Sequence, residues 1–247
     1  SVDLGDNPVS AINFTHKEMG YAGIGFHYLI DRDNQASVLT ARPSSYEGAH
    51  TMDANNNSLG IAVISSCAGL KTYQASGSEL ATANQKSTLE KFLLYQLFKQ
   101  SIFRVVKNDD NTIILKIFGP AGTTSWPQDI ESPLNGVSGK VYKEIIFGHN
   151  DFNTNKMCPC FKVRNALDGK LKDKINGNLK TVWNSILTEA NNNISEVVAW
   201  MLEDGVSYLK PEMITDIIGK KLGIVIKPSV LPDDNFTGKP QSHNSGG

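Results

Sequence analysis

The sequence predicts an α/β fold, a mixed β-sheet flanked by helices, with a helical appendage toward the C-terminus. In the first two thirds of the chain, short apolar segments with the spacing of strands alternate with helical patterns. Beyond Asp168 the composition changes to helix formers interrupted by Gly and Asn. A length of 247 residues and a hydrophobic fraction of 40% suffice for one large domain, or for one domain with a small appendage.

Composition and charge exclude several classes of function. The 24 Lys and Arg residues nearly balance the 25 Asp and Glu residues, so the chain lacks the basic field that holds a nucleic-acid backbone. No apolar run approaches the ~20 residues of a bilayer span, and no charged-then-apolar leader opens the chain. We therefore expect a soluble protein with no nucleic-acid partner and no membrane span.

The first hundred residues are expected to alternate between helix and strand. Asn7-Pro8 suits the N-cap and first position of a helix, and Gly20 suits its end. The turn signal 31–34 separates two strand-like segments, as in a hairpin. The run 59–65 is almost continuously apolar, so we expect a central strand covered on both faces. The expected elements are helices at 7–19 and 79–103 and strands at 24–30, 36–41 and 59–65.

The second half is expected to hold an insertion, one further strand and the helical appendage. The segment from about Lys107 to Gly139 is rich in Gly, Pro and Asn, and its apolar patch 112–118 suits a strand. The run 141–147 is expected to be a strand that leads into a loop containing His and Cys. The expected helices are 179–190, 194–209 and 211–222, and the expected domains are 1–170 with the insertion at about 107–139, the appendage 171–226 and a disordered tail at 227–247.

The strongest chemical signal is the segment 148–161, Gly-His-Asn-Asp-Phe-Asn-Thr-Asn-Lys-Met-Cys-Pro-Cys-Phe. It places the imidazole of His149 at an expected strand end and the thiol of Cys158 on the following loop, with Lys156 two residues earlier. Zinc accepts both donor types, and a catalytic zinc site uses three protein ligands and a water. The spacing alone fits a loop histidine and a small buried cysteine equally well. Cys160 suits either oxidation with Cys158 or simple packing.

Several segments, in order along the chain, resemble one family. They are 16–21 (His-Lys-Glu-Met-Gly-Tyr), 25–33 (Gly-Phe-His-Tyr-Leu-Ile-Asp-Arg-Asp), 48–50 (Gly-Ala-His), 55–61 (Asn-Asn-Asn-Ser-Leu-Gly-Ile) and the loop 149–161. They cover residues 1 to about 167 apart from the insertion, and are similar to the zinc amidase family of phage lysozyme-type endolysins and animal peptidoglycan recognition proteins. The resemblance implies a mixed sheet with helices on its faces and cleavage of the amide between N-acetylmuramic acid and L-alanine in bacterial peptidoglycan.

The resemblance also implies roles for individual residues. His149 and Cys158 match the second and third zinc ligands. Lys156 matches a lysine implicated in catalysis, whose ammonium can stabilise the oxyanion that forms when a zinc-activated water attacks the amide carbonyl. His50 and Asn57 match polar positions that line the substrate groove, with hydrogen bonds that stabilise their own loop as the alternative.

Two departures from the family pattern lead to further expectations. The strand that carries the family's first zinc histidine would precede Ser1, so we expect an upstream segment or a partner chain to complete the sheet and the ligand set. Phe26 stands where the phage enzymes have a tyrosine, and Tyr28, two residues on, is expected to point the same way and is the candidate to replace it. His27 is expected to be a structural histidine with satisfied hydrogen bonds.

The sequence therefore predicts a zinc-dependent N-acetylmuramoyl-L-alanine amidase. We expect it to be phage-encoded and to act on the bacterial cell wall, from the host cytoplasm before lysis or as part of the virion. The alternative is a catalytically impaired relative that binds cell wall or is a structural component of a virion. Docking of the helical appendage to another protein is compatible with either function.

Overall fold

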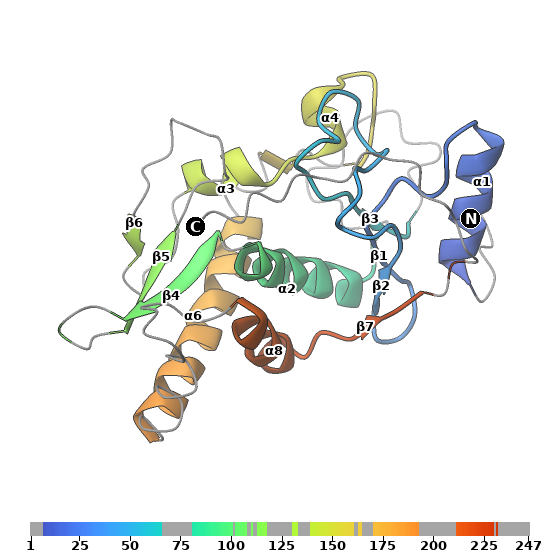
Figure 1. The fold of residues 1–247 in the computed structure, drawn as a ribbon. Coiled ribbons are helices and arrows are strands. Elements are labelled where there is room, and N and C mark those ends of the chain that lie inside the picture. Colours follow the sequence, from blue (N-terminus) through green and yellow to red (C-terminus); the bar gives the residue numbers. More distant parts are fainter. Residues whose placement is uncertain are drawn as a thin grey trace. The chain divides into compact units, whose positions relative to one another are not determined.

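The structure is a computed structural model in which the chain divides into two compact units (Figure 1). Unit 1 comprises residues 1–89, 146–166 and 225–247, and unit 2 comprises residues 90–145 and 167–224. One boundary falls inside a long helix, between Leu89 and Glu90. The structure describes residues 7–65, 81–100, 102–107, 110, 113–117, 130–132, 139–160, 163–164, 170–192, 211–229 and 231.

Unit 1 contains a four-stranded mixed sheet with the strand order β3-β1-β2-β7. β1 pairs antiparallel with β2 and parallel with β3, and β2 pairs parallel with β7. Helices flank this sheet, which agrees with the α/β class that the sequence predicts. The elements are β1 (Tyr28–Ile30), β2 (Val38–Thr40), β3 (Ile61–Val63), β7 (Ile226–Lys227), α1 (Pro8–Glu18) and α4 (His149–Phe152).

Helix α1 packs against one face of the sheet. Its N-cap is Asn7, whose Oδ1 accepts a hydrogen bond from the N–H of Ser10 at 3.1 Å, and Pro8 occupies the first turn, where no N–H is needed. Val9 of this helix is buried against the sheet. Full burial of an aliphatic side chain such as valine contributes about 1.5–3 kcal/mol, so this contact anchors the helix. The helix expected at 7–19 is confirmed. The buried cluster beneath it consists of Val9, Ile24, Leu29, Leu39 and Ala41.

The strands are shorter than the sequence predicts, and β3 is not central. The segments expected at 24–30, 36–41 and 59–65 each form a strand of three residues. Within the described residues, β3 is the terminal strand of its sheet and is only half-buried. Its apolar run reflects packing of Ala62 and Ile64 against the cluster under α1. A continuous apolar run therefore indicates burial but does not fix the order of strands.

Unit 2 combines helices with a second sheet, which is antiparallel and has the order β4-β5-β6. β5 confirms the strand expected within the insertion at 112–118. The helices α6 and α8 confirm those expected at 179–190 and 211–222. The elements are the C-terminal half of α2 (Ala83–Lys99), β4 (Phe103–Lys107), β5 (Ile113–Ile117), β6 (Ile130–Ser132), α3 (Gly139–Ile145), α6 (Lys170–Asn192) and α8 (Pro211–Leu222).

The segment 141–147, expected to be a strand, is helical over most of its length in α3. Tyr142 is fully buried there, and its hydroxyl donates a hydrogen bond to Oδ1 of Asn176 on α6 at 2.6 Å. Two polar residues separate the apolar pairs of this segment, a spacing that also suits a helix. The local pattern was therefore ambiguous, and packing of Tyr142 against α6 decides it.

Two other helix predictions have different outcomes. The long helix α2 ends at Lys99, earlier than expected, and Phe103 begins β4, where its ring packs edge-on against Phe98 at a centroid distance of 5.4 Å. The helix expected at 194–209 lies outside the described residues.

Among the helices that the structure describes, none combines the length and the hydropathy needed to cross a bilayer.

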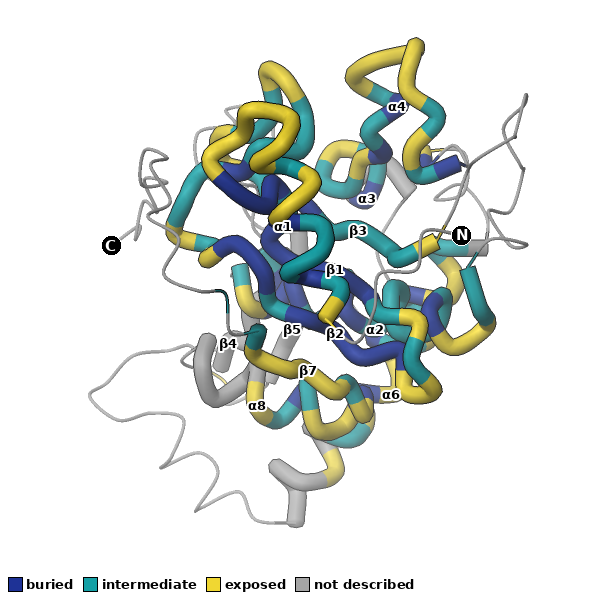
Figure 2. Tube along the Cα trace, turned by 90° about the vertical axis from the view of Figure 1, so that its right-hand side faces the viewer, coloured by how far each residue is buried: buried dark blue, intermediate teal, exposed yellow. Residues whose placement is uncertain are grey.

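The C-terminal segment 225–229 lies along β2, although the sequence predicts a disordered tail from Lys227. The N–H of Val38 donates to the carbonyl oxygen of Val225 at 2.8 Å, and the N–H of Ser229 donates to Oγ1 of Thr40 at 3.1 Å. Figure 2 shows β7 exposed beside the largely buried β2. A strand of two residues is too short to produce a periodic pattern, so sequence reasoning missed it.

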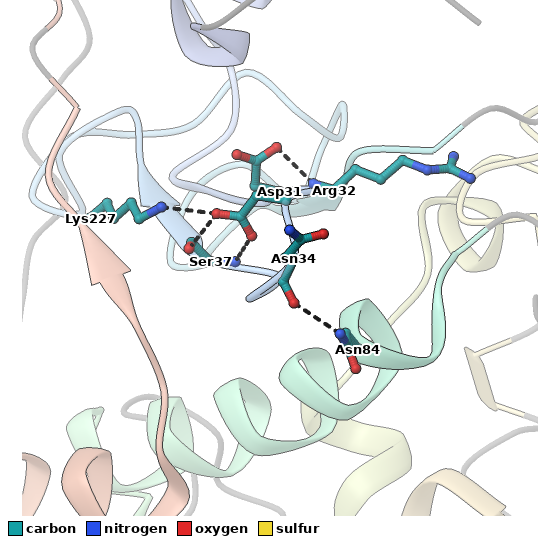
Figure 3. A network of polar contacts seen from close by, with 7 residues as sticks. Asp31, Arg32, Asn34, Ser37, Asn84 and Lys227 are labelled. Atoms are coloured by element: carbon teal, nitrogen blue, oxygen red, sulfur yellow. Dashed lines mark hydrogen bonds and ion pairs between the residues drawn. The ribbon is translucent and has the colours of Figure 1, made fainter.

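An aspartate in the β1–β2 turn joins this segment to the hairpin (Figure 3). Oδ2 of Asp33 accepts from Lys227 Nζ at 2.9 Å and from Ser37 Oγ at 2.7 Å, and Oδ1 accepts from the N–H of Ser37 at 2.8 Å. Desolvation alone would raise the pKa of Asp33, but the hydrogen bonds from Lys227 and Ser37 together lower it to about 2. Asn84 on α2 also donates to the carbonyl oxygen of Asn34 in this turn, at 3.0 Å.

Replacing Lys227 by alanine tests the contribution of this ion pair. Because the pair is partly exposed, we expect Lys227→Ala to lower the free energy of unfolding at pH 7 by about 0.5–1 kcal/mol. The pKa of Asp33 lies below its ordinary value of 3.8, so its contribution is complete above that pH and is lost toward pH 2. The difference in unfolding free energy between Lys227→Ala and the unmodified protein should therefore shrink as the pH falls from above 3.8 toward 2, as measured by urea unfolding. Lys180→Ala, at an exposed position of α6, is the control and should cause no pH-dependent loss of unfolding free energy. An equal loss in that variant would contradict the prediction.

Candidate functional site

His27 is the centre of the hydrogen-bond network of unit 1. Its ring is fully buried. Nδ1 accepts from the N–H of Gly60 at 2.9 Å, so Nε2 carries the proton and donates to the carbonyl oxygen of Tyr46, also at 2.9 Å. The backbone N–H of His27 donates to the carbonyl oxygen of Gly60, and its own carbonyl oxygen accepts from the N–H of Ala41. The expectation of a satisfied structural histidine is confirmed.

His50 is held between two glycines that have no room for a side chain. A Cβ on Gly48 would lie 2.3 Å from Cδ2 of the His50 ring, and a Cβ on Gly60 would lie 2.4 Å from the same atom. Oδ1 of Asn55 accepts from the backbone N–H of His50 at 2.8 Å, which fixes the turn that carries the ring. Nε2 of His50 is buried and has no hydrogen-bond partner among the described residues.

Burial, with the charge of a nearby arginine, keeps three imidazoles of unit 1 uncharged. The guanidinium of Arg42 is buried and donates to two backbone carbonyl oxygens. Burial is the largest reason why the pKa values of His16, His27 and His50 lie below the ordinary value, and the charge of Arg42 lowers all three further. At neutral pH these rings are therefore neutral and can donate or accept hydrogen bonds.

Besides burial, the charge of His149 contributes to the low pKa of His50. Burial, followed by the charges of His27, His149 and Arg42, lowers this pKa to about 4, against an opposing contribution from the carbonyl of Ser58. The charge of His149 thus acts on His50, and Figure 1 shows α4 beside the segment between β2 and β3. These two segments are about a hundred residues apart in sequence.

Gly148 sets the start of α4 and therefore the position of His149. The N–H of Gly148 donates to Oδ2 of Asp151 at 2.7 Å, and the N–H of Asp151 donates back to the carbonyl oxygen of Gly148 at 3.0 Å. A Cβ at Gly148 would lie 2.6 Å from Oδ1 of Asn150 and 2.9 Å from Cγ2 of Val163. Only glycine fits this tight turn, which places His149 at the first position of the helix.

The loop after α4 returns to the same helix. The N–H of Asn150 donates to the carbonyl oxygen of Cys158 at 3.0 Å, which holds the cysteine backbone against the first turn of α4. The N–H of Lys156 donates to the carbonyl oxygen of Asn153 at 2.9 Å. Burial first, and the Lys156 ammonium second, lower the pKa of His149. The loop therefore brings a neutral imidazole and an exposed lysine together, with a cysteine backbone held against the same helix.

The two cysteines of this loop are in different states. Cys158 is a free thiol and is exposed. Cys160 is buried and disulfide-bonded. The structure thus differs from both alternatives for Cys160, since it neither pairs with Cys158 nor is a simple packing cysteine. Cys67, the third cysteine of the chain, lies outside the described residues.

The structure groups some of the predicted site residues and leaves others apart. Tyr28 is only 5% exposed and lies in β1. Asn57 is exposed and has a φ of 59°, a left-handed conformation that asparagine tolerates well in turns. The residues that lie together around α4 are His50, His149, Lys156 and Cys158.

Phe26 and Tyr28 do not share an environment, although strand alternation predicts that they point the same way. β1 begins only at Tyr28, and His27 lies in a bend before it. Phe26 packs against the cluster under α1 that contains Leu29, the neighbour of Tyr28. Since adjacent strand residues face opposite sides, Tyr28 lies on the other face of the sheet. The bend removes the reason for expecting Tyr28 to replace the tyrosine of the phage enzymes.

The donor set of the loop fits part of a zinc site. A neutral imidazole and a free thiol are ligands that zinc prefers, and His149 and Cys158 provide one of each. Within the described ranges, no group of three or more His, Cys, Asp and Glu residues could hold a metal ion. A catalytic zinc site needs three protein ligands, and His149 and Cys158 can be at most two of them.

Sequence reasoning missed several residues that build the site. These residues act through contacts with residues that are distant in sequence or through backbone geometry. They are Arg42, Gly48, Asn55 and Gly60. The only local signal was that Gly48, Asn55 and Gly60 lie within the two short segments that carry the family resemblance around His50.

Comparison with protein-family models, with curated proteins and with solved structures finds no match to this chain.

Filling the space beside His50 should destabilise unit 1. In Gly60→Ala, the new Cβ must displace the His50 ring, and overpacking of this kind typically costs about 1–3 kcal/mol. Gly177→Ala is the matched control, because no heavy atom lies within 4 Å of its Cβ position on α6. That variant should be neutral or stabilising, since alanine favours helix over glycine by about 1 kcal/mol. Urea unfolding of both variants would contradict the prediction if the losses were equal.

The electrostatic contact between Lys156 and His149 can be measured directly. Lys156→Ala removes a positive charge that disfavours the imidazolium, so the pKa of His149 should rise. It should stay below the ordinary value, because burial is the larger cause and is unchanged. NMR titration of the His149 ring in chelator-treated protein gives this pKa. Lys172→Ala on α6 serves as the control, and an unchanged His149 pKa in Lys156→Ala would refute the contact.

Proposed function

We propose that the chain is a zinc-dependent amidase that hydrolyses the bond between N-acetylmuramic acid and L-alanine in bacterial peptidoglycan. One observation carries the proposal. The loop 148–158 folds back on α4, so that His149, Lys156 and the Cys158 backbone lie around one helical turn, with His50 beside it. These are the residues to which the family resemblance assigns metal binding, catalysis and substrate contact.

Under this proposal His149 and Cys158 hold the metal. The third ligand would come from outside the described residues. When bound, zinc would polarise the scissile carbonyl and activate a water at neutral pH. The neutral state of the His149 ring leaves a nitrogen lone pair available for this bond.

Two side chains of the site have roles at the substrate. Lys156 is exposed at the loop, and its ammonium stabilises the negative charge that develops on the carbonyl oxygen during attack. His50 stays neutral because its pKa is about 4, and because its Nε2 is buried we assign the ring to the wall of the substrate groove. Phe26 cannot hydrogen-bond, so Lys156 carries more of the stabilisation than a lysine beside a tyrosine would.

The biological setting follows from the same proposal. An enzyme of this specificity acts on the bacterial cell wall, and we propose a phage lysin, released from the host cytoplasm before lysis or carried by the virion. The alternative function, binding of cell wall or a structural role in a virion without catalysis, makes a different prediction in the assay described next.

The assay measures new L-alanine amino termini released from purified cell walls by the native protein, including any segment that precedes Ser1 in its reading frame. Activity should require zinc and disappear with a chelator. His149→Ala and Cys158→Ala should lose zinc by elemental analysis. Lys156→Ala should retain zinc and lose about 10²–10³-fold in turnover, because it removes an electrostatic stabiliser and no ligand.

Lys172→Ala is the control for removal of a lysine and should leave turnover unchanged. A zinc-loaded native protein that binds the walls and releases no L-alanine termini would overturn the amidase proposal in favour of the binding or structural function. Full activity of Lys156→Ala would remove this lysine from the mechanism.

A further inference from the structure

Two exposed phenylalanines flank the helix that begins with His149. Phe147 precedes α4 and is 38% exposed, and Phe152 ends α4 and is 50% exposed. Their ring centroids lie 5.1 Å apart with an angle of 50° between the planes. Exposed large apolar side chains that gather in one place mark binding surfaces more often than isolated ones do.

The pair is held in position by the surrounding structure. The guanidinium of Arg164 lies over the ring of Phe147 at 5.0 Å from its centroid, a cation–π contact. The exchange of hydrogen bonds between Gly148 and Asp151 fixes the turn between the two rings. A preorganised pair loses little conformational entropy when a ligand binds, so even a small apolar contact area yields measurable affinity.

The immediate surroundings of the pair are polar rather than apolar. The four residues after Phe152, from Asn153 to Lys156, are all exposed and carry amide, hydroxyl and ammonium groups. A protein partner or a lipid surface would require a much wider apolar area than two rings provide. A pyranose ring has the matching chemistry, because one face presents C–H groups to an aromatic ring while its edge presents hydroxyl and acetamido groups to polar side chains.

We propose that Phe147 and Phe152 form a stacking platform for an N-acetylhexosamine unit of a glycan strand. The site rests on the proposed function, since it assigns the sugar side of the substrate to one end of α4. Phe152 provides the outer stacking surface, and Phe147, supported by Arg164, backs it. Asn153 and Asn155 lie next along the chain and can bond the acetamido and hydroxyl groups. A glycan strand seated here lies beside His149 and Lys156.

Binding of chitotetraose, an N-acetylglucosamine tetramer without a peptide, tests the platform independently of hydrolysis. The full chain should bind it in calorimetry or NMR titration. Phe152→Ala should weaken binding about tenfold, equivalent to about 1.4 kcal/mol. Phe152→Trp should retain or strengthen it. Phe14→Ala, at a 66% exposed position of α1, is the matched control and should bind as the unmodified protein does.

Each outcome decides the proposal. It is overturned if the unmodified protein binds no chitotetraose up to about 10 mM, if Phe152→Ala binds equally well, or if Phe14→Ala weakens binding to the same extent. The release of L-alanine termini tests the amidase proposal separately. Phe152-dependent binding without release refutes the amidase and leaves the platform, whereas release without Phe152-dependent binding refutes the platform alone.

Discussion

The fold of unit 1 depends on one uncharged imidazole. His27 joins the entry of β1 to Gly60, which precedes β3, and to Tyr46, which follows β2. Loss of the ring would leave the buried N–H of Gly60 without this acceptor, and an unsatisfied buried group costs about 1–3 kcal/mol. Against a total stability of about 5–15 kcal/mol for a typical domain, this is a large share. Protonation would also break the arrangement, because Nδ1 would then face the N–H of Gly60 with a hydrogen of its own.

The candidate site is built on this network. The ring of His50 meets that of His27 edge-on, with centroids 5.6 Å apart, and the same Gly60 that bonds His27 also walls the His50 ring. A shift of His27 would therefore move His50, and with it the side of the site that faces α4. His27, Gly60 and His50 thus contact one another directly, which links the scaffold to the candidate site.

The sequence predicted those features that local chemistry determines. Asn7 and Pro8 identified the start of α1, and Pro211 identified the start of α8, because capping and first-turn preferences act within a few residues. His149, Lys156 and Cys158 could be found because a single loop carries all three.

Features that depend on tertiary contacts escaped prediction. Tyr142 makes a helix of a segment that also reads as a strand, and its partner Asn176 is 34 residues away. β7 is too short for any periodic signal, and its pairing with β2 joins positions nearly two hundred residues apart. Alternation does not extend from Phe26 to Tyr28, because β1 begins only at Tyr28 and a bend at His27 precedes it, and the local apolar pattern carries no sign of that bend.

Under the proposed function, the positive charges around the site favour the transition state of the reaction over the resting site. The guanidinium of Arg42 and the ammonium of Lys156 disfavour imidazolium ions, and the same positive field opposes a divalent cation. Under the proposed function, a thiolate at Cys158 would offset part of this positive field, which a third histidine would not do. Negative charge that develops on the substrate carbonyl would be stabilised by the same field, so the field would favour the transition state over the resting site.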